Sequence, residues 1–547
     1  MEKRDCSSRL GWFTLAVIIA MVAIGFVPQL ELFGMHLNRV DIFSELRAND
    51  GEVIEYEADI ERLEQELAAM QQPDSLIVVD SLPELPSVRY EWIVEELSDT
   101  TDVRVPSLLN MLPHRPSSSR LRHFADECSV AIEDFDTVEV SRFDKFIEKL
   151  AMGEKVRIAF MGDSFVEGDI LTSDLREQLQ SVFGGRGVGF VACDIPFATV
   201  RRTIKRTSSG WSAYSVMKPK SAPQDVADKF FVSGYVAKGG AGAATRWSVT
   251  NAFEHLDSAT RARVLLYSRD TSSVRITLND TIINDIEVAG YDHMREIYVE
   301  APKIDNISIG VLQGSVLCYG VTIEDYGGVV VDNFSVRSNN GHAIFGTGAA
   351  INREIDEFLG YDLVVLQYGL NIMQKGQRGY SNYRTQLCNM IAYAERCFPD
   401  AAILVLGVSD RWVNSDDTGK YEPIGSVDAL TAHQRAAADS TNVAFWNTSR
   451  AMASLGGMPT FVANGWAAND YTHINFAGGR RIAKQLACAI IAPVCERVEA
   501  LERMSMRKAP MPMPEESELL HNVALHIEGV EPRVEDNSED DVCGVDK

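Results

Sequence analysis

One stretch decides the fold of this chain: VRIAFMGDSFVEGDILTSDLREQLQSVFGG, residues 156–185. It opens with an apolar run from Val156 to Met161, interrupted only by Arg157, which is typical of a buried strand. Behind Ser164, apolar residues recur every three or four positions from Leu171 to Val182, and a glycine pair ends the pattern. The stretch therefore predicts a strand, a turn that carries Ser164, and a helix.

A second pattern lies far downstream, where Asp470-Tyr471-Thr472-His473 precedes another helical segment. A serine needs a base to become a nucleophile, and the base needs a carboxylate that fixes its tautomer. We therefore expect Ser164 as nucleophile, His473 as general base and Asp470 as the group that orients His473. Taken alone, the serine also fits a helix cap, the aspartate a cap or turn, and the histidine a surface position.

In these blocks the chain resembles the SGNH (GDSL-type) hydrolases. The serine block reads Met161-Gly162-Asp163-Ser164, and the final block is the Asp470 to His473 segment. The asparagine block reads Gly369-Leu370-Asn371 after an apolar run, and the glycine block is assigned to Gly341 in Ser338-Asn339-Asn340-Gly341. The resemblance implies a serine esterase reaction that needs no metal and no cofactor.

The same resemblance implies the oxyanion donors. They are the backbone N–H of Ser164, the backbone N–H of Gly341 and the side-chain amide of Asn371, which would stabilise the tetrahedral intermediate. Gly341 also fits a plain turn glycine, and Asn371 a residue that satisfies a turn. Asp163 is expected to brace its turn through hydrogen bonds to the backbone.

A closer resemblance covers Gly162 to Val191 and is to the peptidoglycan O-acetylesterase branch. That branch reads GDS, then Gly-Asp, a helix and a glycine-rich turn, as this chain does. It carries a carbohydrate-binding-like β domain between the serine and glycine blocks. One departure is Phe165, where members of the branch often have histidine, which puts the substrate in doubt more than the catalytic machinery.

The pattern between the blocks agrees with such an insert. From about residue 224 short β-type runs dominate, and Asn279-Asp280 predicts a hairpin turn. From residue 327 strands and helices alternate again, which indicates a parallel sheet flanked by helices. The expected fold is an α/β SGNH-hydrolase (flavodoxin-like) three-layer α/β/α sheet, interrupted by an inserted β-sandwich or jelly-roll domain, with an N-terminal transmembrane helix.

The expected domains follow from these patterns. They are a cytoplasmic N-terminus (1–10), a transmembrane signal-anchor (11–30), an acidic helix and Pro/Ser-rich lead-in (31–125), the first catalytic part (126–223), the inserted carbohydrate-binding-like domain (224–326), the second catalytic part (327–504) and a disordered acidic tail (505–547).

Residues 11–30 are almost continuously apolar, about the 20 residues that a membrane-spanning helix needs. Lys3, Arg4 and Arg9 precede this run, so the N-terminus should stay cytoplasmic and the catalytic part should be periplasmic or extracytoplasmic. A cleaved signal peptide, and hence a secreted protein, is the competing interpretation. We expect an anchor in the inner membrane.

The net charge and the spacing of apolar residues indicate which binding partners the chain could have. The net charge of −26 argues against nucleic-acid binding, which needs a basic surface. Apolar residues between 53 and 70 are spaced three and four apart, as in a short heptad seam. This segment suits either weak self-association or packing within its own domain.

The sequence leaves three functional hypotheses. The first is an exported esterase that removes O-acetyl groups from a cell-envelope glycan, most simply O-acetylated peptidoglycan. The second is an O-acetyltransferase acting on such a polysaccharide, because the same acyl-enzyme can pass its acyl group to a sugar hydroxyl instead of water. The third is a non-catalytic glycan-binding protein.

Overall fold

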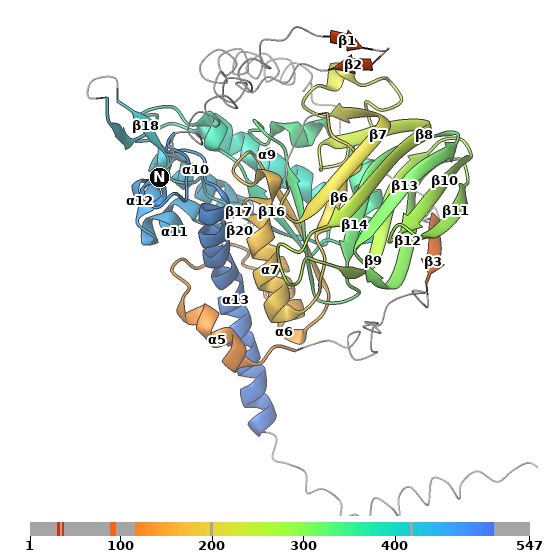
Figure 1. The fold of residues 1–547 in the computed structure, drawn as a ribbon. Coiled ribbons are helices and arrows are strands. Elements are labelled where there is room, and N and C mark those ends of the chain that lie inside the picture. Colours follow the sequence, from red (N-terminus) through yellow and green to blue (C-terminus); the bar gives the residue numbers. More distant parts are fainter. Residues whose placement is uncertain are drawn as a thin grey trace, which may run out of the picture. The chain divides into compact units, whose positions relative to one another are not determined.

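The structure is a computed structural model, and it describes residues 30–32, 35–37, 88–94, 115–196, 201–415 and 419–507. The chain divides into two units, residues 1–85 and 86–547. In the first, β1 (Leu30–Leu32) pairs antiparallel with β2 (Met35–Leu37). The other described elements, from β3 onward, belong to the second unit (Figure 1).

A six-stranded sheet forms the centre of the α/β part. Its strand order is β15-β5-β16-β17-β20-β4, and only the edge strand β4 is antiparallel to its neighbour. The strands are β4 (Glu133–Asp134), β5 (Val156–Gly162), β15 (Val329–Ser335), β16 (Leu363–Gln367), β17 (Ala402–Leu406) and β20 (Ala444–Trp446). Numbered along the chain, the five parallel strands follow the order 2-1-3-4-5, which is the predicted flavodoxin-like order.

Helices cover both faces of this sheet, because β5 is followed by a crossover to one side and the later strands by crossovers to the other. Helices α6 (Arg142–Met152), α7 (Thr172–Phe183) and α13 (Phe476–Arg507) pack together, with α5 (Ser118–Asp126) on α13. A second group contains α8 (Ala349–Leu359), α9 (Ser381–Cys397) and α10 (Val427–Ser440). Short helices α11 (Thr448–Ser454) and α12 (Gly457–Ala463) follow β20.

Helix α13 differs from the sequence expectation. The apolar pattern predicts a helix that ends near Ile491, and the tail is expected to begin at residue 505. The helix instead continues through Pro493 to Arg507. Its later turns still bury Val494 and Val498, and Glu502 accepts hydrogen bonds from Ser118 at the start of α5. Tertiary contact thus outweighs the helix-breaking tendency of the proline.

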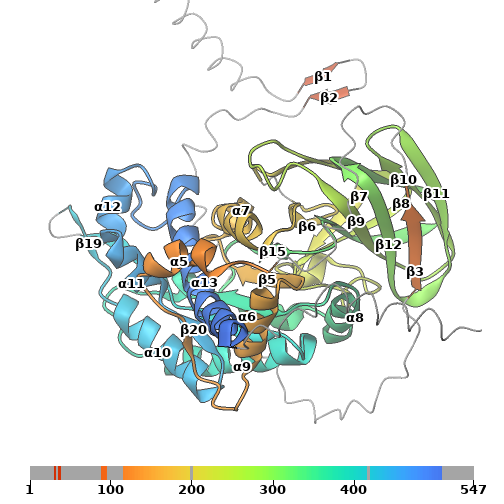
Figure 2. The ribbon, with the colours of Figure 1, turned by 90° about the horizontal axis from the view of Figure 1, so that it is seen from below.

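The second part is a ten-stranded sheet (Figure 2). It consists of β3 (Val88–Ile93), β6 (Gly189–Ala192), β7 (Ile204–Ser215), β8 (Tyr235–Val249), β9 (Ala259–Ser268), β10 (Ser272–Leu278), β11 (Ile282–Val288), β12 (Tyr291–Ile304), β13 (Asn306–Gln313) and β14 (Ser315–Glu324). It encloses a core of its own, including Trp247, Val264 and Ile276. The predicted hairpin is confirmed, since Asn279 and Asp280 both have positive φ between β10 and β11.

The long strand β8 connects two regions of this sheet. Its residues 237–240 pair with β14, and its residues 244–248 pair with β13. A strand that passes from one group of partners to another in this way makes a corner of the kind found in packed β sheets. Because β8 passes between the two groups of partners, hydrogen bonds link all ten strands of the β-sandwich or jelly roll that the sequence predicts.

The sheet also begins earlier in the chain than the predicted start of the insert at residue 224. Strands β6 and β7 precede that position and pair with β14 and β8. Strand β3 lies in the segment expected to be an irregular lead-in, yet it pairs parallel with β12. These strands complete the sheet only through distant partners, so their own short apolar runs do not reveal them.

Buried charges join the two parts. Arg157 on β5 is 1% exposed and binds Asp332 on β15 at 2.5 Å and Glu324 at the end of β14. Glu324 also accepts from Arg261 at 2.5 Å and from Lys155 at 2.8 Å. An ionised group can be buried only when it is paired and hydrogen-bonded. This network therefore fixes the ten-stranded sheet against the α/β part.

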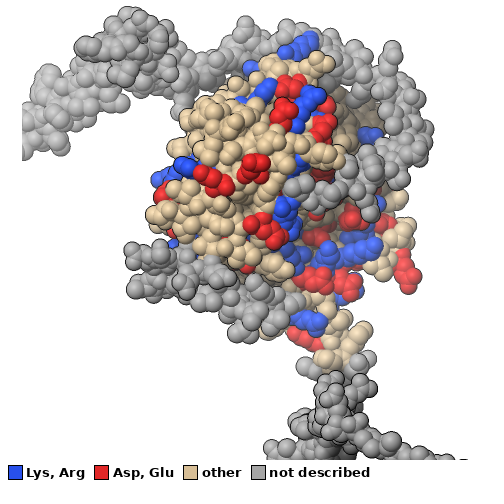
Figure 3. Space-filling view, turned by 90° about the vertical axis from the view of Figure 1, so that its right-hand side faces the viewer, with Lys and Arg blue, Asp and Glu red and all other residues tan. Residues whose placement is uncertain are grey.

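The outer side of the ten-stranded sheet carries charges of both signs (Figure 3). Its exposed ion pairs include Arg246 with Asp280 and Arg275 with Asp285, each at 2.7 Å. The visible described surface therefore presents no extended field of one sign.

Several sequence predictions lie outside the described residues. They are the cytoplasmic segment 1–10, the anchor 11–30 apart from Leu30 in β1, the seam 53–70 and the tail beyond Arg507. Among the helices that the structure describes, none combines the length and the apolar character needed to cross a bilayer.

The cysteines at 128, 193, 318, 388, 397, 488 and 495 are free thiols and form no disulfide bond.

Candidate active site

The serine turn begins where β5 ends. A Cβ at Gly162 would lie 2.4 Å from Val166 Cγ2 and 2.9 Å from Gln367 Oε1, so this close packing against β16 needs glycine. Asp163 Oδ1 then accepts from the Phe165 N–H at 2.9 Å, which confirms that Asp163 braces the turn. Ser164 is left half-buried at the carboxyl edge of the sheet.

The segment after Ser164 differs from a simple strand–turn–helix. A 3-10 turn, η1 (Glu167–Asp169), comes first, and α7 begins only at Thr172. Gly168 and Asp169 both have positive φ, which interrupts helical geometry. Phe165 is 1% exposed, so the residue that departs from the esterase branch lies in the core and cannot contact a substrate directly.

The histidine loop approaches Ser164 from a distant part of the chain. His473 Nε2 lies 3.5 Å from Ser164 Oγ, and His473 Nδ1 lies 2.7 Å from Asp470 Oδ2. The second carboxylate oxygen, Asp470 Oδ1, accepts from the N–H groups of Thr472 and His473 at 2.9 and 3.0 Å. The structure therefore brings together the three residues expected to form a triad.

Electrostatics favours an ionised Asp470. Partial burial opposes its charge, but the hydrogen bonds from the His473 ring and from the Thr472 and His473 amides outweigh burial and lower the pKa of Asp470 to about 2. An ionised Asp470 accepts from Nδ1–H of His473. This leaves the lone pair of Nε2 directed at Ser164, as a general base requires.

Asparagine and glycine blocks follow the neighbouring strands. Asn371 lies in η4 (Leu370–Ile372), directly after β16, and its Nδ2 donates to the Asn339 carbonyl at 3.1 Å. That bond uses one of its two amide hydrogens and leaves the other for an acceptor in the site. Asn371 and Ser164 thus follow β16 and β5, where the strand order reverses and α/β sheets bind ligands.

Gly341 is placed differently from the other expected donors. Its backbone N–H donates to Asn339 Oδ1 at 2.8 Å and is therefore engaged within its own loop. Its φ of 96° favours glycine, and a Cβ there would meet Met390 at 2.2 Å. In this conformation Gly341 shapes the loop, and its N–H has an acceptor within that loop.

Two positioning residues escaped the sequence analysis. Asn339 binds both Gly341 and Asn371, and its place beside the glycine block is the signal that could have drawn attention to it. Gln434 on α10 donates to the Tyr368 carbonyl at 2.7 Å and accepts from the Val408 N–H at 2.8 Å. It thereby ties together the loops after β16 and β17, but a polar residue within a helix gives no local hint of this role.

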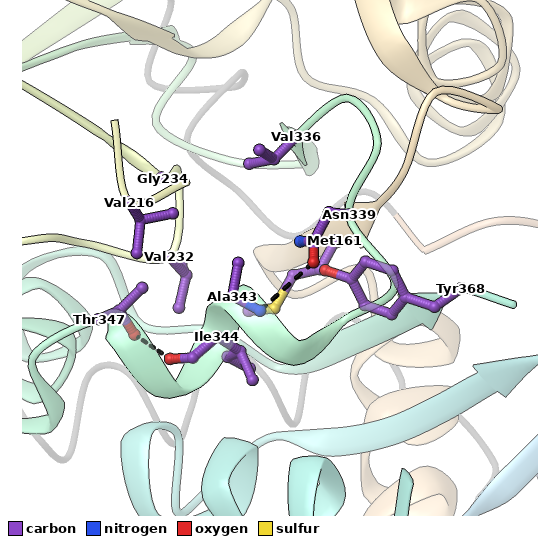
Figure 4. A pocket seen from close by; sticks show the side chains of 10 residues that line it. All are labelled: Met161, Val216, Val232, Gly234, Val336, Asn339, Ala343, Ile344, Thr347 and Tyr368. Carbon is purple, nitrogen blue, oxygen red and sulfur yellow. Dashed lines mark hydrogen bonds between the residues drawn. The ribbon is translucent and has the colours of Figure 1, made fainter. Parts of the chain in front are cut away.

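A small, largely apolar pocket lies beside this edge (Figure 4). Met161, Asn339 and Tyr368 line one side of it, and Val216 and Val232 from the β7–β8 connection line the other. The ten-stranded part therefore contributes to a wall next to the loop that holds Asn371.

No protein-family model matches the chain, and no curated protein matches it in sequence. Among solved structures, a peptidoglycan O-acetylesterase is 20% identical, with 68% of this chain and 99% of that chain covered and a TM-score of 0.53. The chain has the SGNH hydrolase fold.

Two further neighbours are more distant. A lipase/acylhydrolase from Enterococcus faecalis is 15% identical, covering 31% of this chain and 77% of its own, with a TM-score of 0.24. A family two carbohydrate esterase from Cellvibrio japonicus is 8% identical, covering 44% of this chain and 86% of its own, with a TM-score of 0.17. The fold therefore agrees with the resemblance to the SGNH hydrolases that the sequence blocks indicated.

Proposed function

We propose that this SGNH-type protein is a serine esterase that removes O-acetyl groups from a cell-envelope glycan, most simply O-acetylated peptidoglycan. The observation that carries the proposal is the line of contacts from Asp470 through His473 to Ser164. A nucleophile, a base and an orienting carboxylate in this order perform acyl transfer on unrelated folds.

The proposed reaction has two halves. His473 Nε2 takes the Ser164 proton as the oxygen attacks the acetyl carbonyl, and then gives it to the departing sugar hydroxyl. Water attacks the acetyl-enzyme in the second half, and His473 again moves the proton. Ser164 N–H and the second Asn371 amide hydrogen would hold the oxyanion, and Gly341 would support them by shaping the loop.

The distance of 3.5 Å between Ser164 Oγ and His473 Nε2 fits a site without substrate. Catalytic hydrogen bonds are often long in the free enzyme and tighten in the complex. Support for the glycan comes from the fold, which is similar to that of a peptidoglycan O-acetylesterase over 99% of that chain.

The test is acetate release from O-acetylated peptidoglycan by the full chain and by its Ser164→Ala variant. We expect the variant to lose at least about 10⁴-fold in rate, since removing such a nucleophile leaves only binding and oxyanion stabilisation. Ser335→Ala is a matched control, because Ser335 ends the neighbouring strand β15 and hydrogen-bonds Asn333. Full activity in Ser164→Ala would falsify the proposal.

The same acyl-enzyme also permits transfer to a sugar hydroxyl. Water access decides between the two outcomes, so the products must be measured together. Free acetate as the main product supports the esterase, whereas acetylated glycan without matching acetate identifies an O-acetyltransferase. Binding of glycan without either product would identify a glycan-binding protein.

We further propose that the chain acts outside the cytoplasm as a membrane-anchored protein, on the basis of the apolar run at 11–30 and the cations before it. Membrane fractionation with protease protection tests this. Sedimentation with membranes and digestion of the catalytic part from the outer side are expected. A soluble protein of reduced length would show signal-peptide cleavage instead.

A further inference from the structure

Three aromatic rings form a cluster beside the histidine loop. Tyr421 stacks on Tyr471 with ring centres 4.0 Å apart and planes 17° apart. Trp412 lies 6.5 Å from Tyr471 with its plane tilted by 34°. Trp412 and Tyr421 belong to β18 (Trp412–Asn414) and β19 (Tyr421–Pro423), which form a two-stranded sheet of their own.

This aromatic cluster is tied directly to the triad. Tyr471 is the residue between Asp470 and the Thr472-His473 pair, and its carbonyl accepts from the Trp412 N–H at 3.1 Å. The β18–β19 hairpin lies on the side of the α/β part opposite the ten-stranded sheet in both ribbon views (Figures 1 and 2). The cluster therefore extends the catalytic edge away from that sheet.

Packing alone does not account for the cluster. Trp412 and Tyr471 contact the core, but Tyr421 is not among the side chains packed against it and is 37% exposed. Tyr471 holds a φ of 55°, a conformation that bulky side chains rarely adopt and that tends to occur at functional sites. An isolated two-stranded hairpin is also marginal in water. The chain thus maintains costly local structure that keeps an exposed ring stacked on Tyr471, two residues before His473.

We propose that Tyr421, supported by Tyr471 and Trp412, is a sugar-stacking subsite that holds one pyranose ring of the glycan next to the sugar that carries the ester. An exposed aromatic face accepts the C–H face of a neutral sugar ring, and aromatic residues commonly line ligand sites. This inference rests on the proposed function and names how the polymer is held.

The test compares a polymeric and a small substrate. The readout is the ratio of kcat/KM on O-acetylated glycan to kcat/KM on 4-nitrophenyl acetate, which has no sugar to stack. Tyr421→Ala is expected to lower this ratio by about three- to tenfold, the scale of a ring-stacking contact. Tyr421→Phe keeps the ring and should keep the ratio.

A control removes an equally exposed apolar side chain outside the ten-stranded sheet. Leu501 near the end of α13 is 40% exposed, so Leu501→Ala should leave the ratio unchanged. An unchanged ratio in Tyr421→Ala, or an equal fall in Leu501→Ala, would overturn the subsite.

A second measurement separates this inference from the proposed function. If the unaltered protein cleaves the small ester but releases no acetate from the glycan, the proposed substrate fails. Binding of the deacetylated glycan to Ser164→Ala and to the double variant with Tyr421→Ala then tests the subsite alone. Weaker binding by the double variant supports the subsite, and equal binding refutes it.

Discussion

The carboxyl group of Asp163, next to the proposed nucleophile, should make the stability of this protein depend on pH. Burial raises the pKa of Asp163 from 3.8 to about 7, against the opposing influence of the Phe165 N–H and of His473. Each unit of difference between the pKa of the folded and unfolded chain corresponds to about 1.4 kcal/mol. The rise therefore corresponds to about 4 kcal/mol of stability.

The direction of this pH dependence follows from whether the folded or the unfolded chain binds the Asp163 proton more tightly. Because the pKa of Asp163 is raised in the folded chain, no stability is lost below about pH 4, where both states are protonated. Between about pH 4 and pH 7 the unfolded chain ionises first, so stability falls as pH rises. Above about pH 7 both states are ionised, and the loss stays constant.

Asp163→Asn removes this titration and keeps an oxygen that can accept from the Phe165 N–H. The free energy of unfolding of the variant, relative to the unaltered chain, should therefore rise by about 3 kcal/mol from pH 5 to pH 8. Urea unfolding at several pH values measures this, with the transition of the α/β part followed separately if the curve has two steps. Asp285→Asn, at an exposed carboxylate paired with Arg275, is the control. A stability difference between Asp163→Asn and the unaltered chain that does not change with pH would refute the reasoning.

Three further outcomes are expected. Asp470→Asn should lower kcat by about 10⁴-fold on a small acetate ester with the fold intact, because the His473 tautomer is no longer fixed; a fall of less than tenfold would exclude a triad. Asn371→Ala should lower kcat by about 10²–10³-fold through loss of an oxyanion donor, and a change in KM alone would contradict that role. Glu324→Gln should cost about 3–5 kcal/mol in urea unfolding, because it leaves the buried Arg157 and Arg261 short of negative charge. Arg275→Gln at the exposed pair should lower the free energy of unfolding by less than about 1 kcal/mol. Equal losses in these two variants would contradict the argument that breaking a buried ion pair destabilises the fold more than breaking an exposed one.

The order of strands and helices was largely readable from the sequence, because it depends on local periodicity. The apolar run from Val156 to Met161 is buried throughout as β5, and the pattern after it became α7. Two-residue turns with strong local preferences, such as Asn279-Asp280, were predictable for the same reason. The residue types of the triad were also visible, since a serine, a histidine and an aspartate stand in blocks of recognisable spacing.

Only the tertiary structure decided which groups meet. Ser164 and His473 are separated by 309 positions, and no local pattern states that their side chains lie 3.5 Å apart. Long-range hydrogen bonding likewise recruited β3 and joined Asn371 to Asn339, and the packing of distant segments stacked Tyr421 on Tyr471. The physical reason is that periodicity records which face of an element is apolar, whereas hydrogen-bond partners and buried charge pairs depend on how distant elements pack.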